Sequence, residues 1–298
     1  MIQAVERRLE QYVSSLEQPL ITELYRKLPH GKRLRAKLIL YIAGGTHEAI
    51  KLASIVELIH AASLLHDDVI DDAMLRRNKP SINAVYGNKI SIMLGDILYS
   101  KGFYELTMME SKIAQIISNA VTQLSIGELY DVEMAKEFNC DKNKYIDMIY
   151  GKTASLIEAS AWSAALLCGK SAQNYKQYGR NLGLAFQMID DILDITSSSE
   201  VLGKPSLHDF SEGKTTIPYI YLYYALDNEK KAILKSFHKK ILSKDEEDWI
   251  LDEMKQNDIL SKCYSDAKSL IDEAISLMSY ENEPKLVAIA KEMIDRNF

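Results

Sequence analysis

Proline and glycine are scarce in this sequence, and the prolines are unevenly spread. Six prolines occur in 298 residues, and none lies between positions 81 and 204, the most apolar third of the chain. Because proline is excluded from helix interiors, long proline-free stretches with helical periodicity indicate long helices. No stretch shows sustained strand alternation. The sequence therefore predicts an all-α fold, a bundle of ten or more helices, in one domain over residues 1–298.

Cysteines are also few. The three of them, Cys140, Cys168 and Cys263, are far apart and form no CxxC pair, so a reducing cytosol is favoured. The most apolar runs, residues 217–226 and 159–169, fall short of the roughly 20 residues that a spanning helix needs. The N-terminus lacks the apolar core of a signal peptide. We expect a cytoplasmic protein without a transmembrane segment and with peripheral membrane contact at most.

The chain also lacks an excess of basic over acidic residues. The net charge is −6 and the pI is near 5.6, which argues against nucleic-acid binding. Two dense basic clusters nevertheless occur, "HGKRLRAK" at 30–37 and "RRNK" at 76–79. Arginine binds phosphate oxygens bidentately, and lysine acts as a point charge. The clusters therefore indicate a small anionic substrate.

Two copies of a DDxxD pattern, at 67–71 and 190–194, lie in apolar helical contexts. The first and last carboxylates of each copy point the same way, one helical turn apart. Like charges at this spacing destabilise a helix unless a cation offsets them, and Mg²⁺ prefers carboxylate oxygen that it shares with substrate phosphates. The recurrence favours metal binding over a solvated acidic helix end. The candidate metal ligands are Asp67, Asp71, Asp190 and Asp194.

His60 falls on the same predicted helix face as Asp67. A single histidine in such a place is more often a hydrogen-bonded core residue than a ligand. Glu57 and His60 also spell ExxH, the ligand pair of di-iron bundles, but that fold needs two such pairs and the sequence has one.

Acidic pairs, separate basic clusters and an apolar bundle together imply a substrate with an anionic head and an apolar tail. The chain resembles the trans-prenyltransferases, the polyprenyl diphosphate synthases. The stretches that carry the resemblance lie between residues 30 and 220 and are, in order, "HGKRLRAK", "ELIHAASLLHDDVIDDAMLRR", "GNKISIMLGDILYS", "YGKTASLIEAS", "FQMIDDILD" and "LGKPSLHDFSEGKTTIPYI". The resemblance implies an isoprenoid-synthase fold around a deep central cavity, usually as a homodimer.

The resemblance also implies a role for each matching residue. Asp67 and Asp71 would hold Mg²⁺ on one side of an allylic diphosphate, and Asp190, with Asp194 behind it, on the other, for two to three ions in all. The catalytic set would be Asp67, Asp71, Lys152 and Asp190. The allylic substrate would contact Arg76, Lys152, Thr153, Gln187 and Lys204. Isopentenyl diphosphate would contact Lys32, Arg35, His60 and Arg77.

The reaction implied is ionisation of the allylic diphosphate, attack by isopentenyl diphosphate and loss of a proton. The oxygen dipoles of Thr153 and Gln187 are hypothesised to face the carbocation. Three positions depart from the family pattern: His30 and Ala36 in the first basic cluster, and Asn78 where glycine commonly follows the arginine pair. Asparagine tolerates left-handed backbone, so that change is mild, and none of the three removes a charged ligand.

Chain length in this family depends on the residues four and five before the first DDxxD, here Ser63 and Ala62. At 1.5 Å per residue they lie roughly 6–8 Å down the helix from Asp67. Small side chains leave the tunnel open, which predicts long-chain products of about C30–C45, of the octaprenyl type that feeds quinone side chains. Tyr130 and Met134 are candidates for the tunnel floor. The alternative is a farnesyl or geranylgeranyl diphosphate synthase.

Two rival classes share some of these features. A class I terpene cyclase has one DDxxD, normally pairs it with an NSE/DTE motif, and needs no second diphosphate site. The regulatory subunit of a heteromeric synthase typically loses aspartates, and this chain keeps both sets. The primer, geranyl or farnesyl diphosphate, is left open.

Overall fold

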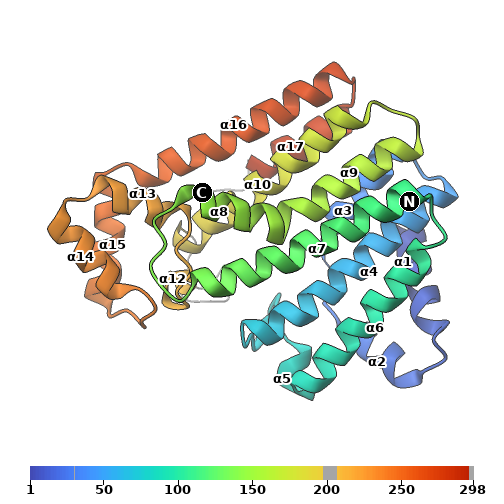
Figure 1. The fold of residues 1–298 in the computed structure, drawn as a ribbon, viewed down its shortest axis with the longest axis horizontal. Coiled ribbons are helices and arrows are strands. Elements are labelled where there is room, and N and C mark those ends of the chain that lie inside the picture. Colours follow the sequence, from blue (N-terminus) through green and yellow to red (C-terminus); the bar gives the residue numbers. More distant parts are fainter. Residues whose placement is uncertain (30, 197–206, 295–298) are drawn as a thin grey trace. The chain divides into compact units, whose positions relative to one another are not determined.

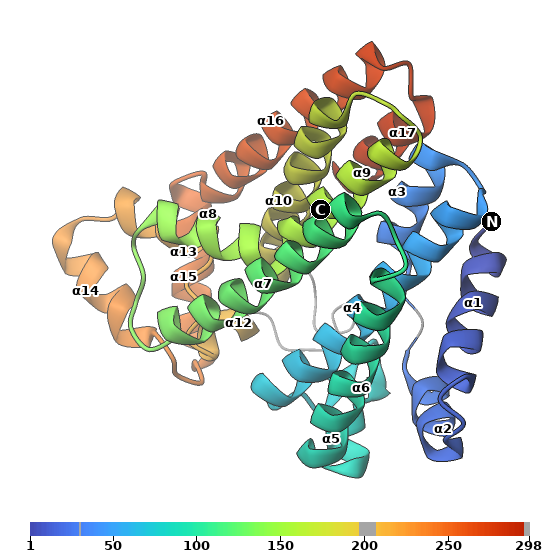
Figure 2. The same cartoon turned by 45° about the vertical axis from the view of Figure 1, so that its right-hand side comes forward.

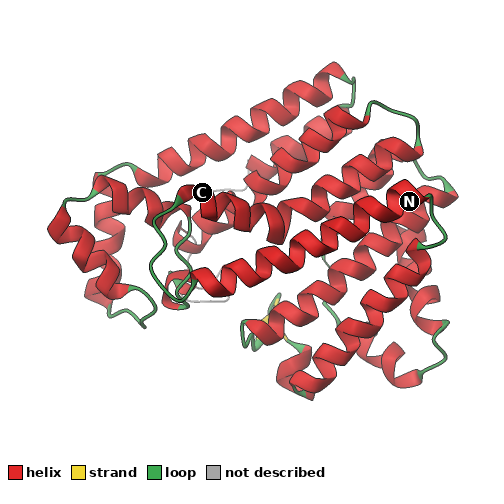
Figure 3. Ribbon diagram, viewed as in Figure 1, coloured by secondary structure: helices red, strands yellow, loops and turns green. Residues whose placement is uncertain are grey.

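The computed structural model describes residues 1–29, 31–196 and 207–294, and over these it is almost entirely helical (Figures 1 and 3). The all-α prediction with ten or more helices is confirmed. The chain divides into two compact units. Unit 1 is built from residues 1–121 and 156–176, and unit 2 from residues 122–155 and 177–298. Helices α7 (Ser111–Met134) and α10 (Ala172–Thr196) each contribute residues to both units.

Unit 1 is organised around helix α4 (His47–Ile70), which packs against α1, α3, α5 and α6 (Figure 2). The helix begins where the Thr46 side chain accepts a hydrogen bond from the Ala49 N–H, as an N-cap should. It is buried on most sides, and accordingly its sequence is apolar nearly all round. The other helices of unit 1 are α1 (Ile2–Ser14), α2 (Pro19–Lys27), α3 (Leu34–Ala43), α5 (Ile82–Tyr86), α6 (Asn88–Leu106) and, apart from its first residue, α9 (Ser155–Leu167).

Within the described ranges, α4 is also the single helix whose length and composition would let it cross a membrane. Of its most apolar window, 67% is buried inside the structure. The central helix of a folded core has these same properties.

Unit 2 contains the C-terminal helices. Helix α16 (Ile259–Tyr280) packs against α13, α15 and α17, and Figure 1 shows it running alongside α17. The ring of Phe210 stacks on that of Tyr219 with centroids 4.1 Å apart. The remaining helices of unit 2 are α8 (Lys142–Ile149), η1 (Tyr150–Ala154), α12 (His208–Ser211), α13 (Ile217–Ala225), α14 (Asn228–Phe237), α15 (Lys244–Gln256) and α17 (Pro284–Ile294).

The helical run over residues 142–167 is not a uniform α-helix. Asp141 caps it, accepting a hydrogen bond from the Asn143 N–H at 2.8 Å, and Gly169 follows its end with a φ of +67°. Aspartate is a preferred N-cap residue and glycine a preferred residue just after a helix end, so the sequence favours both boundaries. Between α8 and α9, however, one turn, η1, is a π-helix, which the sequence did not predict. Such turns frequently occur at functional sites.

Three glycines of unit 2 explain how this π turn is accommodated. A Cβ on Gly127 of α7 would lie 2.1 Å from the Lys152 nitrogen, and one on Gly183 of α10 would lie 2.5 Å from the Ala154 Cα. A Cβ on Gly151 itself would lie 2.8 Å from the Gln123 oxygen. The π turn therefore contacts α7 and α10 backbone to backbone, which residues with side chains would prevent.

A small β-hairpin departs from the expectation of no strand. Strands β1 (Leu75–Arg76) and β2 (Lys79–Pro80) pair antiparallel and are the yellow segments of Figure 3. The two turn residues, Arg77 and Asn78, have φ of 53° and 59°. A two-residue turn of this kind requires left-handed backbone at both positions, and this is the conformation expected to be tolerated at Asn78.

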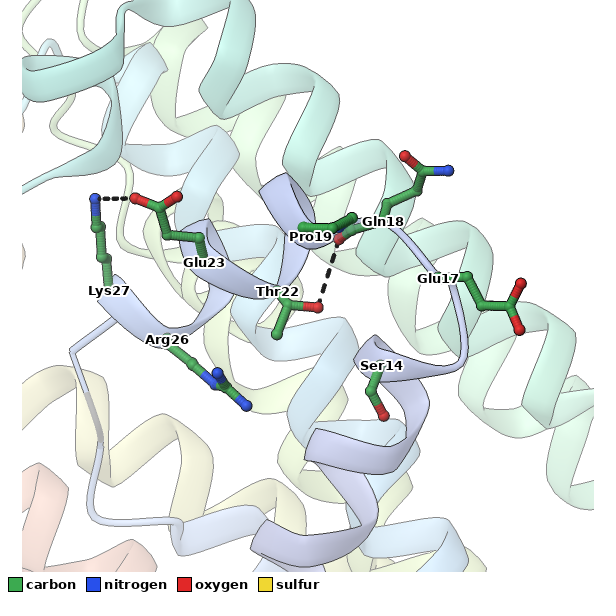
Figure 4. Close-up of a pocket in the computed structure, with 8 residues that line it drawn as sticks. All are labelled: Ser14, Glu17, Gln18, Pro19, Thr22, Glu23, Arg26 and Lys27. Carbon is green, nitrogen blue, oxygen red and sulfur yellow. Dashed lines mark hydrogen bonds and ion pairs between the residues drawn. The ribbon is translucent and has the colours of Figure 1, made fainter.

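The segment 197–216 is polar and contains glycine and proline, which predicts a loop. Its residues 197–206 lie outside the described ranges, and the rest contains the short helix α12. A separate surface hollow of about 570 Å³ occurs between the end of α1 and the helix α2 (Figure 4). None of its eight lining residues belongs to the predicted site. They are Ser14, Glu17, Gln18, Pro19, Thr22, Glu23, Arg26 and Lys27.

We expect Gly127→Ala to destabilise the protein by about 1–3 kcal/mol, because the new methyl group overlaps backbone atoms of the π turn. A loss of that size lowers the melting temperature by roughly 2–4 °C for each kcal/mol. Gly45→Ala is the matched control, because its Cβ would meet only the flexible side chain of Met1. Equal melting temperatures for the two variants, measured by calorimetry, would contradict the close packing described above.

Candidate active site

The first aspartate motif occupies the C-terminal end of α4. Asp67 lies in the last turn and is half-buried, and Asp71 is the C-cap residue, whose N–H donates to the Asp67 carbonyl oxygen at 2.8 Å. No basic residue lies in that last turn. Helix C-termini carry partial negative charge, so carboxylates there raise the electrostatic energy and attract cations.

The middle aspartate of this motif has a different role from its neighbours. Asp68 is buried, and its Oδ1 accepts a hydrogen bond from Arg76 Nε at 2.5 Å. Its backbone carbonyl accepts another from Asn83 Nδ2 at 2.9 Å. One residue along a helix is a rotation of about 100°, so Asp68 leaves the face that Asp67 and Asp71 share. It instead holds Arg76, a predicted ligand of the allylic substrate, beside the motif.

The hairpin after α4 separates the two arginines of the pair. Arg76 stays in the strand and turns to Asp68, whereas Arg77 is at the turn and donates from NH1 to the Pro29 carbonyl oxygen at 3.0 Å. A Cβ on Gly31 would lie 2.6 Å from that same NH1. Glycine at position 31 therefore leaves the guanidinium room to lie against the backbone of the first basic cluster, and a larger residue would displace it. Arg77 also keeps a left-handed φ, a strained conformation of the kind found at functional sites.

Arg35 and His60 form the second part of this basic region. Arg35 NH1 lies 3.1 Å from His60 Nε2. Arginine has no acceptor atom, so Nε2 accepts the hydrogen bond and the histidine proton is on Nδ1. Burial and then the charges of Arg35, Arg77, Arg76 and Arg33 lower the pKa of His60 well below 6.5. Burial lowers the pKa of Arg35 to about 10, and Arg77 contributes to that shift. An anion placed here would relieve this crowding of positive charge.

Arg33 is an internal anchor rather than part of this basic region. Its guanidinium contacts Glu6 at 2.7 Å and Glu57 at 3.1 Å, and Glu57 also accepts from the Ala36 N–H. Glu57 is thus committed to Arg33 and the start of α3, which removes the di-iron interpretation of Glu57 and His60. Among the described residues, no group of three or more histidine, cysteine, aspartate or glutamate side chains is arranged to hold a metal.

The remaining predicted residues of unit 1 differ in exposure. Lys32 is exposed, as a mobile phosphate contact would be. Ala62 is fully buried, and the Ser63 hydroxyl donates to the carbonyl oxygen of His60 in its own helix. Gly95 and Gly102 of α6 lie against His66 and Ile59, on the side of α4 that Ala62 shares by helical spacing.

The second aspartate motif occupies the corresponding place on α10. Asp190 is half-buried, and Asp194, two residues before the helix end, is buried and accepts from the Asp209 N–H at 3.4 Å. Again no basic residue lies in the last turn. Both motifs therefore share one electrostatic design: carboxylates one turn apart at the negative end of a helix.

A chain of hydrogen bonds runs behind this second motif. Thr153 Oγ1 donates to Gln187 Oε1 at 2.8 Å, and Gln187 Nε2 donates to Asp191 Oδ1 at 2.9 Å. The other oxygen of Asp191 accepts from the Tyr145 hydroxyl at 2.6 Å. Burial raises the pKa of Tyr145 well above its usual value, so its hydroxyl keeps the proton that it donates. Asp191, like Asp68, is the middle aspartate of its motif and contacts protein groups.

Lys152 lies within the π turn and is held by two carboxylates of α7. Its Nζ lies 2.9 Å from Glu128 and 2.6 Å from Asp131, both buried. The lysine side chain is 21% exposed, so its charge is balanced but still accessible. Neither Glu128 nor Asp131 was expected from the sequence, since each is an ordinary acidic residue of a polar helix segment.

The structure thus gathers the predicted residues into two groups. Unit 1 holds those of the first aspartate motif, the arginine pair, the first basic cluster and the chain-length positions. Unit 2 holds Lys152, Thr153, Gln187, Asp190 and Asp194. Lys204, predicted to contact the allylic substrate, lies outside the described residues, as does His30.

The carboxylates of the two motifs fit Mg²⁺ by their chemistry. Mg²⁺ is typically bound by one or two carboxylates, several waters and substrate phosphates rather than by an all-protein cage. Asp67, Asp71 and Asp190 offer hard oxygen donors that are partly exposed, at helix ends that favour a cation. These residues would hold the ion, with Asp194 supporting Asp190.

We expect His60 to stay neutral, with its proton on Nδ1, as the pH falls from about 8 to about 6, because burial and the arginine charges lower its pKa. Ring-nitrogen NMR of the histidine-labelled protein measures this. An unfolded chain takes up that proton near pH 6.5, so acidification through this range lowers stability. Inorganic diphosphate should raise the pKa by offsetting the positive field, whereas sodium chloride of equal ionic strength should not. A normal pKa that diphosphate leaves unchanged would contradict an anion site here.

Comparison with known proteins places these motifs in a family. Residues 18–254 match the polyprenyl synthetase family. Solanesyl-diphosphate synthase 2 of Oryza sativa is 39% identical over 217 residues, which are 67% of this chain and 53% of the rice protein, so the match spans about half the length of that relative.

Two solved structures extend the likeness to the whole chain. Octaprenyl pyrophosphate synthase from Helicobacter pylori is 42% identical with a TM-score of 0.94, covering 99% of this chain and 98% of that one. Polyprenyl synthase from Caulobacter crescentus, solved with calcium and isoprenyl diphosphate, is 27% identical with a TM-score of 0.91, covering 100% of this chain and 95% of that one. The predicted isoprenoid-synthase fold and the resemblance to prenyltransferases are confirmed. The chain belongs to the polyprenyl synthetase family.

Proposed function

We propose that the protein is a trans-prenyltransferase that condenses an allylic diphosphate with successive molecules of isopentenyl diphosphate into a long-chain polyprenyl diphosphate. The observation that carries the proposal is the pair of DDxxD motifs at the C-terminal ends of α4 and α10, in a chain of this family. The basic region formed by Arg35, His60 and Arg77 supports a second diphosphate.

The chemistry follows from the charges of these residues. The C–O bond of the allylic diphosphate breaks, its electron pair stays on the diphosphate, and a carbocation remains. The double bond of isopentenyl diphosphate attacks that carbon to form a C–C bond, and loss of a proton restores a double bond. Bound Mg²⁺ would neutralise the diphosphate charge. Arg76 and Lys152 stabilise the same charge as it develops, which is worth more in a site that excludes water.

The residues proposed to bind each substrate are those that the family resemblance implies. Arg76, Lys152, Thr153 and Gln187 receive the allylic substrate, and Lys32, Arg35, His60 and Arg77 receive isopentenyl diphosphate. His60 is suited to the latter role because its Nδ1 is a buried donor with no protein acceptor in the described structure. A neutral histidine can donate that proton to a phosphate oxygen without a second charge.

The long-chain product is proposed from the small residues Ala62 and Ser63, and the octaprenyl synthase likeness supports it. Products of about C30–C45 would serve as precursors of quinone side chains. Tyr130 is 51% exposed, so it does not lie in the core of unit 2. Chain lengths made by variants of residues deeper in the protein would identify the residue that closes the tunnel.

Assembly and location are proposed from the exposed side chains and the cysteines. Helix α6 exposes Ile92, Met93 and Tyr104, and exposed apolar side chains in such numbers support a homodimer. The three cysteines are unpaired, which supports a reducing cytoplasm. Release of an apolar product supports peripheral contact with a membrane.

The activity is tested by incubating the protein with Mg²⁺, farnesyl diphosphate and labelled isopentenyl diphosphate. We expect Asp67→Asn to lower the rate by about 100-fold or more, because a ligand charge in the transition state is lost. Asp72→Asn is the matched control, since Asp72 is exposed and its left-handed φ of 47° suits asparagine. Chelation of Mg²⁺ should abolish the reaction. A folded wild-type protein without incorporation would favour the regulatory subunit or the cyclase.

We expect Ala62→Tyr to shorten the product to about three isoprene units, because a ring at this fully buried position fills the path of the growing tail. Ala61→Tyr is the control, since Ala61 is only half-buried. Chromatography of the dephosphorylated products measures the chain lengths. If Ala62→Tyr still makes the wild-type length, position 62 does not set it.

A further inference from the structure

Tyr145 and Asp191 are a buried pair that the reaction described above does not use. Tyr145 is fully buried on α8 and Asp191 is 3% exposed on α10, and both belong to unit 2. Neither is a predicted ligand of metal or substrate. Their contact, Tyr145 hydroxyl to Asp191 Oδ2 at 2.6 Å, ends a chain that begins at two residues of the proposed site, Thr153 and Gln187.

The direction of every hydrogen bond in this chain follows from Asp191 in its ionised form. An ionised carboxylate only accepts, so the group of Gln187 that faces it must be the NH₂. The amide oxygen of Gln187 then faces Thr153, and the Thr153 hydroxyl must donate its proton to that oxygen. The Tyr145 hydroxyl satisfies the second carboxylate oxygen. Burial raises the pKa of Asp191 well above its usual value, against the hydrogen bonds from Tyr145 and Gln187, which favour its ionised form. With Asp191 ionised, this is the arrangement that satisfies all four groups.

This polarity has a consequence for the ionisation step. With its proton directed to Gln187, the Thr153 oxygen has only lone pairs left for the substrate side. Gln187 likewise presents its oxygen, not its NH₂, at the Thr153 end. Oxygen lone pairs are the negative ends of these dipoles, and such preoriented dipoles stabilise positive charge without reorganisation during the reaction. The reverse orientation would direct an N–H or O–H hydrogen at the carbocation.

We propose that Tyr145 and Asp191 are positioning residues that fix the dipoles of Gln187 and Thr153 for carbocation stabilisation. This inference rests on the proposed prenyl transfer. Tyr145 acts through Asp191, and Asp191 acts through Gln187, so neither touches the substrate. The first motif offers a parallel: Asp68, at the same place in its DDxxD, orients Arg76. The middle aspartate of each motif therefore orients a substrate-binding side chain of its own unit.

Tyr145→Phe tests the proposal with the smallest change. It removes one hydroxyl and keeps the buried ring, so Asp191 loses one of its two donors. Tyr178→Phe is the matched control. Tyr178 is also fully buried, belongs to unit 2, and donates its hydroxyl to the Leu286 carbonyl oxygen at 2.9 Å, outside the chain of bonds. Both variants lose one buried hydrogen bond, so their melting temperatures should fall by similar amounts.

The two variants should differ in catalysis. For the first condensation with farnesyl diphosphate, we expect Tyr145→Phe to lower kcat by about 10-fold or more, because misoriented groups in a site cost rates of this order. KM for both substrates and the Mg²⁺ requirement should stay within about two-fold of wild type, as should kcat of Tyr178→Phe. Equal kcat for the two variants would overturn the proposal, and so would a loss confined to KM.

Asp191→Asn provides a second, independent test. Its amide cannot accept from both Tyr145 and Gln187, so one donor loses its acceptor or the Gln187 amide reverses. We expect a larger fall in kcat than for Tyr145→Phe, and a folded variant with wild-type kcat would contradict the proposal even if Tyr145→Phe failed to fold. An inactive wild-type protein would refute the proposed function itself, whereas an active one with insensitive variants would refute only this inference.

Discussion

The constraint on which the site depends is the placement of like charges at the ends of two helices. Helices α4 and α10 each end with carboxylates one turn apart, where the helix itself carries partial negative charge and no basic residue lies in the last turn. Like charges at this spacing destabilise a helix, and in the proposed function a divalent cation would offset that cost. The cation in turn needs anionic ligands to complete its shell, which the diphosphate of a substrate provides. Binding of the metal and binding of the substrate are therefore expected to be mutually dependent.

The other charged residues of the described chain differ in the groups that they contact. Arg33 is neutralised by Glu6 and Glu57, and Lys152 by Glu128 and Asp131. Arg35 and Arg77, in contrast, contact a neutral histidine and a backbone carbonyl, and they lower the pKa of His60 together. Within unit 1, Arg35 and Arg77 and the carboxylates of Asp67 and Asp71 are the charges that the proposed function assigns to a metal-bound diphosphate. The balanced groups hold the backbone that presents these charges.

Much of this fold and site followed from the sequence, and what did not has a physical reason. The lengths of α4 and α10, the cap at Asp141 and the left-handed Asn78 are local consequences of periodicity and backbone preference. The π turn could not be predicted, because it depends on backbone contacts between segments far apart in sequence. The role of Tyr145 could not be predicted for the same reason. In the sequence it is an ordinary residue of a helix face, and its contact with Asp191 depends on the packing of α8 against α10. In the sequence, Arg33 cannot be distinguished from the other basic residues of its cluster. Its ion pair with Glu6 in the structure shows that it is a structural residue.

The dependence of diphosphate binding on a divalent cation tests this account most directly. Calorimetric titration of the intact protein with inorganic diphosphate, with and without Mg²⁺, measures it without any turnover. The account predicts binding at least about 10-fold tighter with Mg²⁺, a difference of roughly 1.4 kcal/mol, and loss of that gain in Asp67→Asn. Equal affinity with and without Mg²⁺ would show that the carboxylates at the helix ends do not need a cation to admit the substrate. That result would contradict the central claim.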